Sequence, residues 1–244
     1  MSFGIFNQII AETGVLAILG LLVATVLRGR IDWGWFAAAV AFFFVHKLVL
    51  FLGLIDGILP NLIGGRYNWE GKIAGTIFSL VIAFVFLRNS RMEWGLTLRQ
   101  TGPAVKWGWT IAALVAVANA AFVFWYWPGT SSADLADWTY QLTMPSLDEE
   151  LVYRGILLLM LERAFRPTLN LLGVPVGWGA LITILIFYVS HALRVDADWD
   201  VAFIAGDILP FIYASFWVYV RAATGSLLAP VLLHSWANTA GYIL

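Results

Sequence analysis

The stretch QIIAETGVLAILGLLVATVL, residues 8–27, is apolar at almost every position. A helix needs about 20 mostly apolar residues to cross the hydrocarbon core of a membrane, so this stretch predicts a membrane-spanning helix. The first ten residues contain no Lys or Arg, whereas a cleaved secretory signal begins with basic residues. We therefore expect this helix to be retained.

The composition of the whole chain indicates lipid as its main solvent. Of the 244 residues, 61% are hydrophobic and 12% are charged, whereas about 25% of residues are charged in soluble domains. Most of the 13 tryptophans lie where an apolar run ends, as in the aromatic belts of membrane interfaces. The chain has no Cys, which excludes disulfides and thiolate nucleophiles. Its formal charge of −1 gives no reason to expect nucleic acid as a partner.

Further apolar runs along the chain qualify, or nearly qualify, as spans. They predict an all-α, polytopic membrane helical bundle of about eight transmembrane helices. The expected helices cover residues 8–27, 33–54, 72–87, 105–127, 147–165, 172–193, 201–220 and 225–243. We expect one integrated domain, in which residues 1–104 supply the first three helices and a cytoplasmic loop, and residues 105–244 supply the remaining helices as a core.

The basic residues predict how the bundle is oriented, because Lys and Arg concentrate in cytoplasmic loops. One set of loops contains nine of the 14 basic residues: Arg28, Arg30, Arg88, Arg91, Arg99, Lys106, Arg163, Arg166 and Arg221. The opposite set contains three: Arg66, Lys72 and Arg194. Both termini and the loops 128–146 and 196–200 are therefore expected outside, and the loop 88–106 in the cytoplasm.

The segment SLDEELVYRG, residues 146–155, brings adjacent carboxylates to the expected start of an apolar helix. Pro145 is expected to end the preceding structure, and Ser146 has the position of an N-cap. Glu149 follows three residues later, which is the spacing of a capping box. Capping of the helix is therefore one explanation for Glu149.

The second carboxylate of this segment has a different expected partner. Glu150 and Arg154 are spaced i and i+4 with the acid first, the favourable order for an ion pair within a helix. Glu149 then lies on a face about 100° away and can point into a cavity between helices. Lys47 and Asp207, in other expected helices, are interpreted as a structural pair.

The histidines add further polar groups to apolar helices. His191 has Phe187 one turn before it, His234 has Asn238 one turn after it, and His46 lies within the second expected helix. An isolated histidine in a membrane helix is usually a packing residue, but polar groups on several helices can meet in one bundle. A carboxylate and an imidazole can activate water, while a second imidazole and an amide can stabilise an oxyanion.

At these residues the chain resembles the CPBP family, which contains CAAX prenyl proteases and bacteriocin-processing enzymes and is also called the Abi family. The family's three signature motifs correspond, in order, to Glu149-Glu150-x-x-x-Arg154, Phe187-x-x-x-His191 and His234-x-x-x-Asn238. The likeness extends over residues 105–244. Each motif alone is a weak signal, but three in order on expected membrane helices form a specific one.

The resemblance implies an intramembrane endopeptidase of a prokaryotic cell membrane. Its substrate would be a membrane-associated peptide or protein, prenylated or of the leader type. Glu149 resembles the catalytic glutamate, which with His191 would polarise a water molecule for attack on a peptide carbonyl. His234 and Asn238 would form the oxyanion site. The supporting residues implied by the motifs are Glu150, Arg154 and the packing residue Phe187.

A zinc ion is the competing mechanism, because zinc accepts the carboxylate and imidazoles of Glu149, His191 and His234. Members of the resembled family have been described both as metalloproteases and as metal-independent glutamate proteases. The chain has no H-E-x-x-H helix that would present two imidazoles one turn apart. We therefore expect hydrolysis without a metal or another cofactor.

Other functions are compatible with the sequence. A non-proteolytic membrane scaffold or subunit could keep the motifs as polar contacts and bind a protein, lipid or pigment partner. A small-molecule transporter is disfavoured, because inverted repeats and broken helices are not evident. Membrane lipid is an expected partner, nucleic acid is not, and the sequence sets no oligomeric state. The expected orientation opens the site away from the cytoplasm, whereas eukaryotic members of the family process prenylated substrates at the cytoplasmic face.

Overall fold

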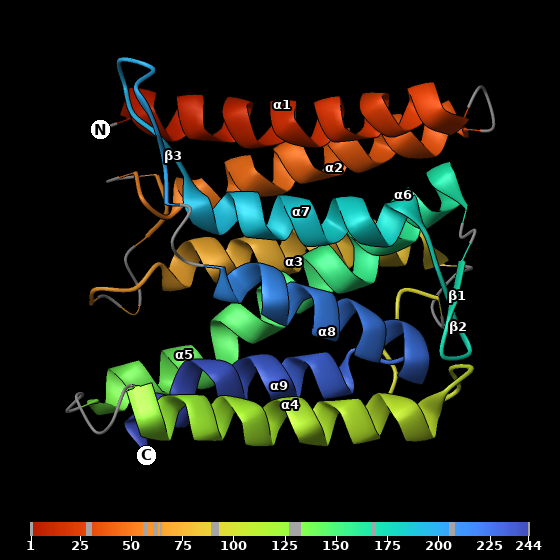
Figure 1. The fold of residues 1–244 in the computed structure, drawn as a ribbon. Helices are drawn as coiled ribbons and strands as arrows, with labels where there is room; N and C mark the ends of the chain where they lie inside the picture. The colour runs from red at the N-terminus through yellow and green to blue at the C-terminus, as the bar shows by residue number, and fades with distance from the viewer. Residues whose placement is uncertain are drawn as a thin grey trace.

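The computed structural model describes residues 2–27, 31–55, 58–60, 63, 65–88, 93–126, 133–166, 169–204 and 208–243. These residues form a bundle of helices whose axes run roughly parallel, with both ends of the chain at the same end of the bundle (Figure 1). The α-helices are α1 (Ser2–Leu27), α2 (Trp33–Leu52), α3 (Trp69–Phe86), α4 (Val105–Tyr126), α5 (Leu135–Glu149), α6 (Leu158–Phe165), α7 (Trp178–Ala192), α8 (Leu209–Thr224) and α9 (Leu228–Thr239).

Among the described residues, four helices are long and apolar enough to cross a membrane. These are Gly4–Leu27, Trp33–Leu52, Trp69–Phe86 and Val105–Tyr126. The helices α7, α8 and α9 contain 15, 16 and 12 residues, fewer than the roughly 20 that a span needs. The helical fold is therefore confirmed, with four candidate membrane spans, whereas the expected number of about eight transmembrane helices is not.

Two expected helices, 172–193 and 201–220, begin as β-structure instead. The strand β1 (Leu169–Leu171) pairs with β2 (Val174–Val176), and β3 (Leu193–Val195) pairs with β4 (Val201–Phe203), both in antiparallel hairpins. Leu172 and Gly173 turn the first hairpin with φ angles of 50° and 84°, which an α-helix does not contain. Apolar composition does not distinguish such short strands from helix ends, so it extends the expected helices too far.

The paired carboxylates lie in the middle of a helical segment and not at its start. The helix α5 continues into the π-helical segment η2 (Glu150–Leu157) and then into α6. The expected boundary at Pro145 and Ser146 is therefore wrong, since Pro145 lies inside α5. The true N-cap is Asp134, which forms a capping box with Asp137 and supplies the acceptor for the free N–H groups at the helix start.

Ser146 and Glu149, the predicted capping residues, have other partners. Ser146 Oγ donates to the carbonyl of Thr143 at 3.0 Å and lies 2.8 Å from Ser235 Oγ of α9. Glu149 makes no side-chain capping hydrogen bond. The capping explanation for Glu149 therefore fails, because its helix has already formed fourteen residues earlier at Leu135.

The π-helical segment lies at the centre of the bundle. It contacts α2, α3, α7 and α8, and all of its residues are buried. Leu151, Ile156 and Leu157 join the main hydrophobic core, and Glu150 and Arg154 are buried among them. A π-helical turn of this kind is rare and frequently marks a functional site.

Two basic residues of the orientation count are buried within helices and are not loop charges: Lys72 in the first turn of α3 and Arg221 in the last turn of α8. The count of nine against three becomes eight against two, which favours the same orientation. Three members of the larger set lie outside the described residues: Arg28, Arg30 and Arg91.

Candidate active site

Glu149 lies at the junction of α5 and η2, where it faces three other helices. Its Oε1 accepts a hydrogen bond from Lys72 Nζ of α3 at 2.7 Å. Its Oε2 lies 3.8 Å from His191 Nε2 of α7 and 3.9 Å from His234 Nε2 of α9. Within the described residues, this buried oxygen has no hydrogen-bond partner. A carboxylate oxygen therefore points at two imidazole nitrogens across gaps that are too long for direct hydrogen bonds.

The hydrogen bonds of the two imidazoles determine which nitrogen carries a proton. His191 Nδ1 lies 2.8 Å from the carbonyl oxygen of Phe187, and His234 Nδ1 lies 2.8 Å from Glu150 Oε1. A carbonyl or carboxylate oxygen only accepts, so both Nδ1 atoms donate. In the neutral rings, both Nε2 atoms therefore present lone pairs to the space beside Glu149 Oε2.

Glu150 and Arg154 form the expected contact, and both side chains are completely buried. Arg154 Nη1 lies 3.3 Å from Glu150 Oε1, and both side chains have an exposed fraction of 0%. The guanidinium also lies over the rings of Phe187 at 4.0 Å and Trp217 at 5.1 Å. The same Glu150 oxygen accepts from His234, so this carboxylate holds both the arginine and one histidine of the site.

Aromatic rings fix the orientation of both histidines. His234 stacks on Trp217 of α8 at 4.3 Å, and His191 packs against Phe187 at 4.4 Å. Trp217 was not expected at the site, because nothing in its local sequence distinguishes it from the interfacial tryptophans. Such stacking limits ring rotation and keeps Nε2 directed at Glu149.

Asn238 lies apart from the other candidate residues. It is half-buried and lines a cavity of about 310 Å³ with Asn119, Val123 and Tyr213, residues of α4 and α8. In the described part of the chain, no hydrogen bond joins Asn238 to the glutamate or the two histidines. It follows His234 by one helical turn, about 5.4 Å along α9.

Two charged residues of the site were missed by sequence reasoning. Lys72 Nζ also bonds Asp148 Oδ2 at 3.0 Å, although the two residues are 76 positions apart. Asp148 has an exposed side-chain fraction of 1%. The only signal in the sequence is that Lys72 begins a long apolar run, where an unpaired ammonium is costly.

A second buried ion pair corrects the expected partner of Lys47. Lys47 Nζ lies 2.7 Å from Glu12 Oε2, whereas Asp207 lies outside the described residues. Ser190 Oγ donates to Glu12 at 2.7 Å and accepts from Tyr153 at 2.9 Å. Glu12 is the one charged residue of the apolar stretch 8–27, which is the signal that it needs an intramembrane partner.

The site is accessible from the side of His191. The side chain of His191 is 38% exposed, that of Glu149 is 17% exposed and that of His234 is 5% exposed. At the same end of α7, a cavity of about 580 Å³ lies among α1, α2 and the hairpin β3–β4, and Glu12, Ser190 and Arg194 are among its lining residues. The hairpin lies at the same end of the bundle as the chain termini (Figure 1).

A zinc ion would need the carboxylate and both imidazoles as ligands. In the tautomers described above, each Nδ1 donates to an oxygen, which is the usual arrangement around histidines that bind a metal. However, no group of three or more His, Cys, Asp or Glu side chains in the described residues is placed to hold a metal ion. Hydrolysis without a metal therefore stays a prediction.

Comparison with known proteins identifies the C-terminal part of the chain. The family model described as "Type II CAAX prenyl endopeptidase Rce1-like" matches residues 130–240. This range contains all three motifs singled out in the sequence, and the predicted family is thereby confirmed. No curated protein and no solved structure matches the chain.

Proposed function

Residues 130–240 belong to the CAAX-type protease family, and we propose that the protein is an intramembrane endopeptidase in which Glu149 and His191 activate the attacking water. The observation that supports this most directly is the unpartnered Oε2 of Glu149, 3.8 Å from His191 Nε2. The proposed water oxygen bridges both atoms at about 2.6–3.2 Å from each.

In the proposed reaction, the water donates its hydrogens to Glu149 Oε2 and His191 Nε2 and attacks the peptide carbonyl carbon. The new C–O bond forms as one proton passes to Glu149, and the carbonyl oxygen becomes an oxyanion. Glu149 then transfers this proton to the departing amine nitrogen as the C–N bond breaks. Both proton transfers use one carboxylate, as general base and then general acid.

His234 is proposed to stabilise the oxyanion. Glu150 holds its Nδ1 at 2.8 Å, which positions the ring for this role. Asn238 is proposed to assist from one turn further along α9, where it lines a separate cavity.

The proposed substrate is a peptide held at the membrane, either prenylated or of the leader type. The proposed mechanism requires no metal, because the carboxylate and the imidazole activate water themselves. The orientation of the loop charges favours entry from outside the cytoplasm.

The test uses purified protein in detergent with a fluorescence-quenched peptide that ends in a farnesylated CAAX sequence, the same peptide without the lipid, and a leader-type peptide. We expect the wild-type protein to cleave at least one of them and Glu149→Gln to cleave none. The melting temperature of Glu149→Gln should fall little, because the amide oxygen still accepts from Lys72 and Asp148 still pairs with that lysine. Cleavage at a wild-type rate by Glu149→Gln would contradict the proposal. A folded wild-type protein that cleaves none of the peptides would favour the non-proteolytic subunit instead.

A further inference from the structure

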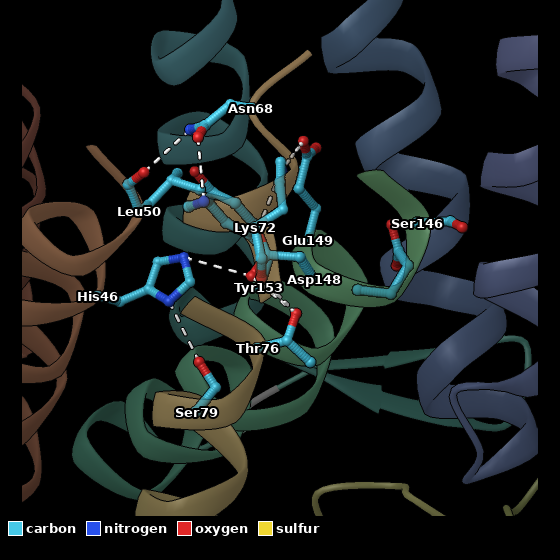
Figure 2. Close-up of polar contacts among 12 residues, drawn as sticks. His46, Leu50, Asn68, Lys72, Thr76, Ser79, Ser146, Asp148, Glu149 and Tyr153 are labelled. Atoms are coloured by element: carbon cyan, nitrogen blue, oxygen red, sulfur yellow. Dashed lines mark hydrogen bonds and ion pairs between the residues drawn. The ribbon is translucent and has the colours of Figure 1, made fainter. Parts of the chain in front are cut away.

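The ammonium of Lys72 lies between two adjacent carboxylates. It contacts Glu149 Oε1 at 2.7 Å and Asp148 Oδ2 at 3.0 Å, and Figure 2 shows it reaching both from α3. The helix α3 lies outside the range 130–240 matched by the family model. A residue from the N-terminal part of the chain thus contacts the proposed catalytic carboxylate directly.

The carboxylate oxygen of Asp148 that does not contact Lys72 has partners of its own, and these restrain the Lys72 ammonium indirectly. Its Oδ1 accepts from Thr76 Oγ1 at 3.4 Å and lies 3.8 Å from His46 Nε2 of α2. The His46 ring is itself located by a 3.2 Å contact between Nδ1 and Ser79 Oγ (Figure 2). Lys72 therefore cannot move toward solvent without leaving a buried carboxylate unpaired, which is strongly unfavourable.

Gly75 makes this arrangement sterically feasible. A Cβ at this position would lie 2.9 Å from His46 Cε1 and 3.2 Å from Asp148 Oδ1. Only a residue without a side chain allows α3 to approach both groups so closely. The backbone of α3 is thus placed to bring Lys72 within reach of Asp148 and Glu149.

Because of the contact with Lys72, the two carboxylate oxygens of Glu149 have different partners. Oε1 is occupied by the ammonium, whereas Oε2 faces His191 and His234. A charge-assisted bond favours the ionised carboxylate and restricts its rotation. A base that must accept a proton from water needs both conditions at once.

We propose that Lys72, fixed by Asp148, is a positioning residue that holds Glu149 ionised and directs its Oε2 between His191 and His234. This inference rests on the proposed peptidase function and deepens it. It makes the N-terminal helices a part of the catalytic machinery as well as a membrane anchor. Lys72 itself does not contact the reacting atoms.

Several ionisable groups from the surrounding helices act electrostatically on or beside Glu149. They are His46, Lys47, Lys72, Tyr140, Asp148, Glu150, Tyr153, Arg154, His191 and His234. Among these described groups, Lys72 is the one that hydrogen-bonds the Glu149 carboxylate. Removing Lys72 therefore removes, within the described residues, both the closest positive charge and the hydrogen bond that restrains the Glu149 carboxylate.

The first experiment compares Lys72→Met, Lys72→Arg and the double variant Lys72→Met/Asp148→Asn in peptide cleavage and thermal unfolding. In Lys72→Met we expect kcat to fall by about 100-fold, the cost of a small misplacement of a catalytic group, with KM nearly unchanged. Lys72→Arg keeps the charge and should recover part of kcat. The double variant removes both opposite charges and should recover melting temperature but not kcat. Recovery of kcat together with melting temperature would show that Lys72 is only structural and would overturn the inference.

The second experiment needs no substrate. Dicyclohexylcarbodiimide modifies protonated carboxyl groups in apolar surroundings, and peptide mass spectrometry locates the modified residue. We expect Glu149 to be modified slowly in the wild-type protein and several-fold faster in Lys72→Met and in the double variant. Equal rates in all three proteins would overturn the inference.

The two experiments separate this inference from the proposed function. Glu149→Gln is the common control, because it removes both the base and the site of modification. If Glu149→Gln still cleaves peptide, the proposed function fails whatever Lys72 does. If Glu149→Gln is inactive and the double variant has wild-type kcat, the function stands and the role of Lys72 fails.

Discussion

The substitution Glu150→Gln should destabilise the fold, because it leaves Arg154 without a counter-ion in the centre of the bundle. The pair is separated by 3.3 Å and both side chains are fully buried. With an effective dielectric constant of about 20, two unit charges at this distance attract by roughly 5 kcal/mol. A glutamine oxygen can still accept from the arginine, which recovers about 1.5–3 kcal/mol. The expected net loss is about 3 kcal/mol.

The assay is thermal unfolding of the purified protein in detergent. A loss of about 3 kcal/mol corresponds to a fall of about 6–12 °C in the melting temperature of a chain of this size. Adding Arg154→Met should recover part of the fall, because it removes the stranded charge and keeps an unbranched apolar chain against Phe187 and Trp217.

A surface pair provides the matched control. Glu93 and Arg163 are 2.6 Å apart, but their side chains are 55% and 27% exposed. Glu93→Gln should therefore cost less than about 1 kcal/mol. If Glu150→Gln melts no lower than Glu93→Gln, or if the double variant melts no higher than Glu150→Gln, the electrostatic reasoning about the buried pair is wrong.

Three further predictions concern the metal, the orientation and the pH dependence. Extensive chelation should leave cleavage intact, and purified protein should bind well under one equivalent of zinc; loss of activity on chelation with recovery on adding zinc would reverse this expectation. A cysteine introduced at the exposed Asp198 should react in intact cells with a membrane-impermeant thiol reagent, whereas one at the exposed Arg99 should not; the reverse pattern would invert the orientation. Hydrogen bonds from Tyr67 and Arg66 lower the pKa of Asp137 to about 2, below its ordinary value of about 4. The stability that this carboxylate contributes is therefore present above pH 4 and lost as the pH falls toward 2, so Asp137→Asn should flatten the melting temperature over this interval; an unchanged pH dependence would refute this assignment.

The sequence predicts the parts of the fold that depend on local chemistry. Long apolar runs identify the first four helices, because a membrane selects length and composition and little else. The same reasoning fails for the hairpins β1–β2 and β3–β4, since strands of three residues carry no periodic signal. It also places a helix start at Ser146, because Pro145 is a helix breaker by local rules, whereas the helix begins at the capping box of Asp134 and Asp137.

The sequence predicts only those parts of the candidate site that involve residues close together in the chain or residues of known sequence motifs. The Glu150–Arg154 contact follows from i,i+4 spacing, and the three motifs identify Glu149, His191 and His234. The contact between Lys72 and Glu149 joins residues 77 positions apart, and no periodicity in one sequence specifies such a pair. Asn238 lies close to His234 in sequence, one helical turn away, but this spacing does not determine which cavity its side chain faces.

The π-helical segment sets the rotational phase between the two halves of the helix that carries the site. Each residue advances an α-helix by about 100°, and a π-helical turn accommodates one residue more than an α-helical turn. Deleting a single residue between Arg154 and Leu158 would convert the segment to α-helix. With α6 fixed in the bundle, α5 would then rotate and Glu149 would turn away from Lys72, although every motif residue would remain. The spacing of this protein is thus as much a part of its chemistry as its side chains: conservative substitutions of the apolar residues of η2 should be tolerated far better than insertions or deletions of one residue.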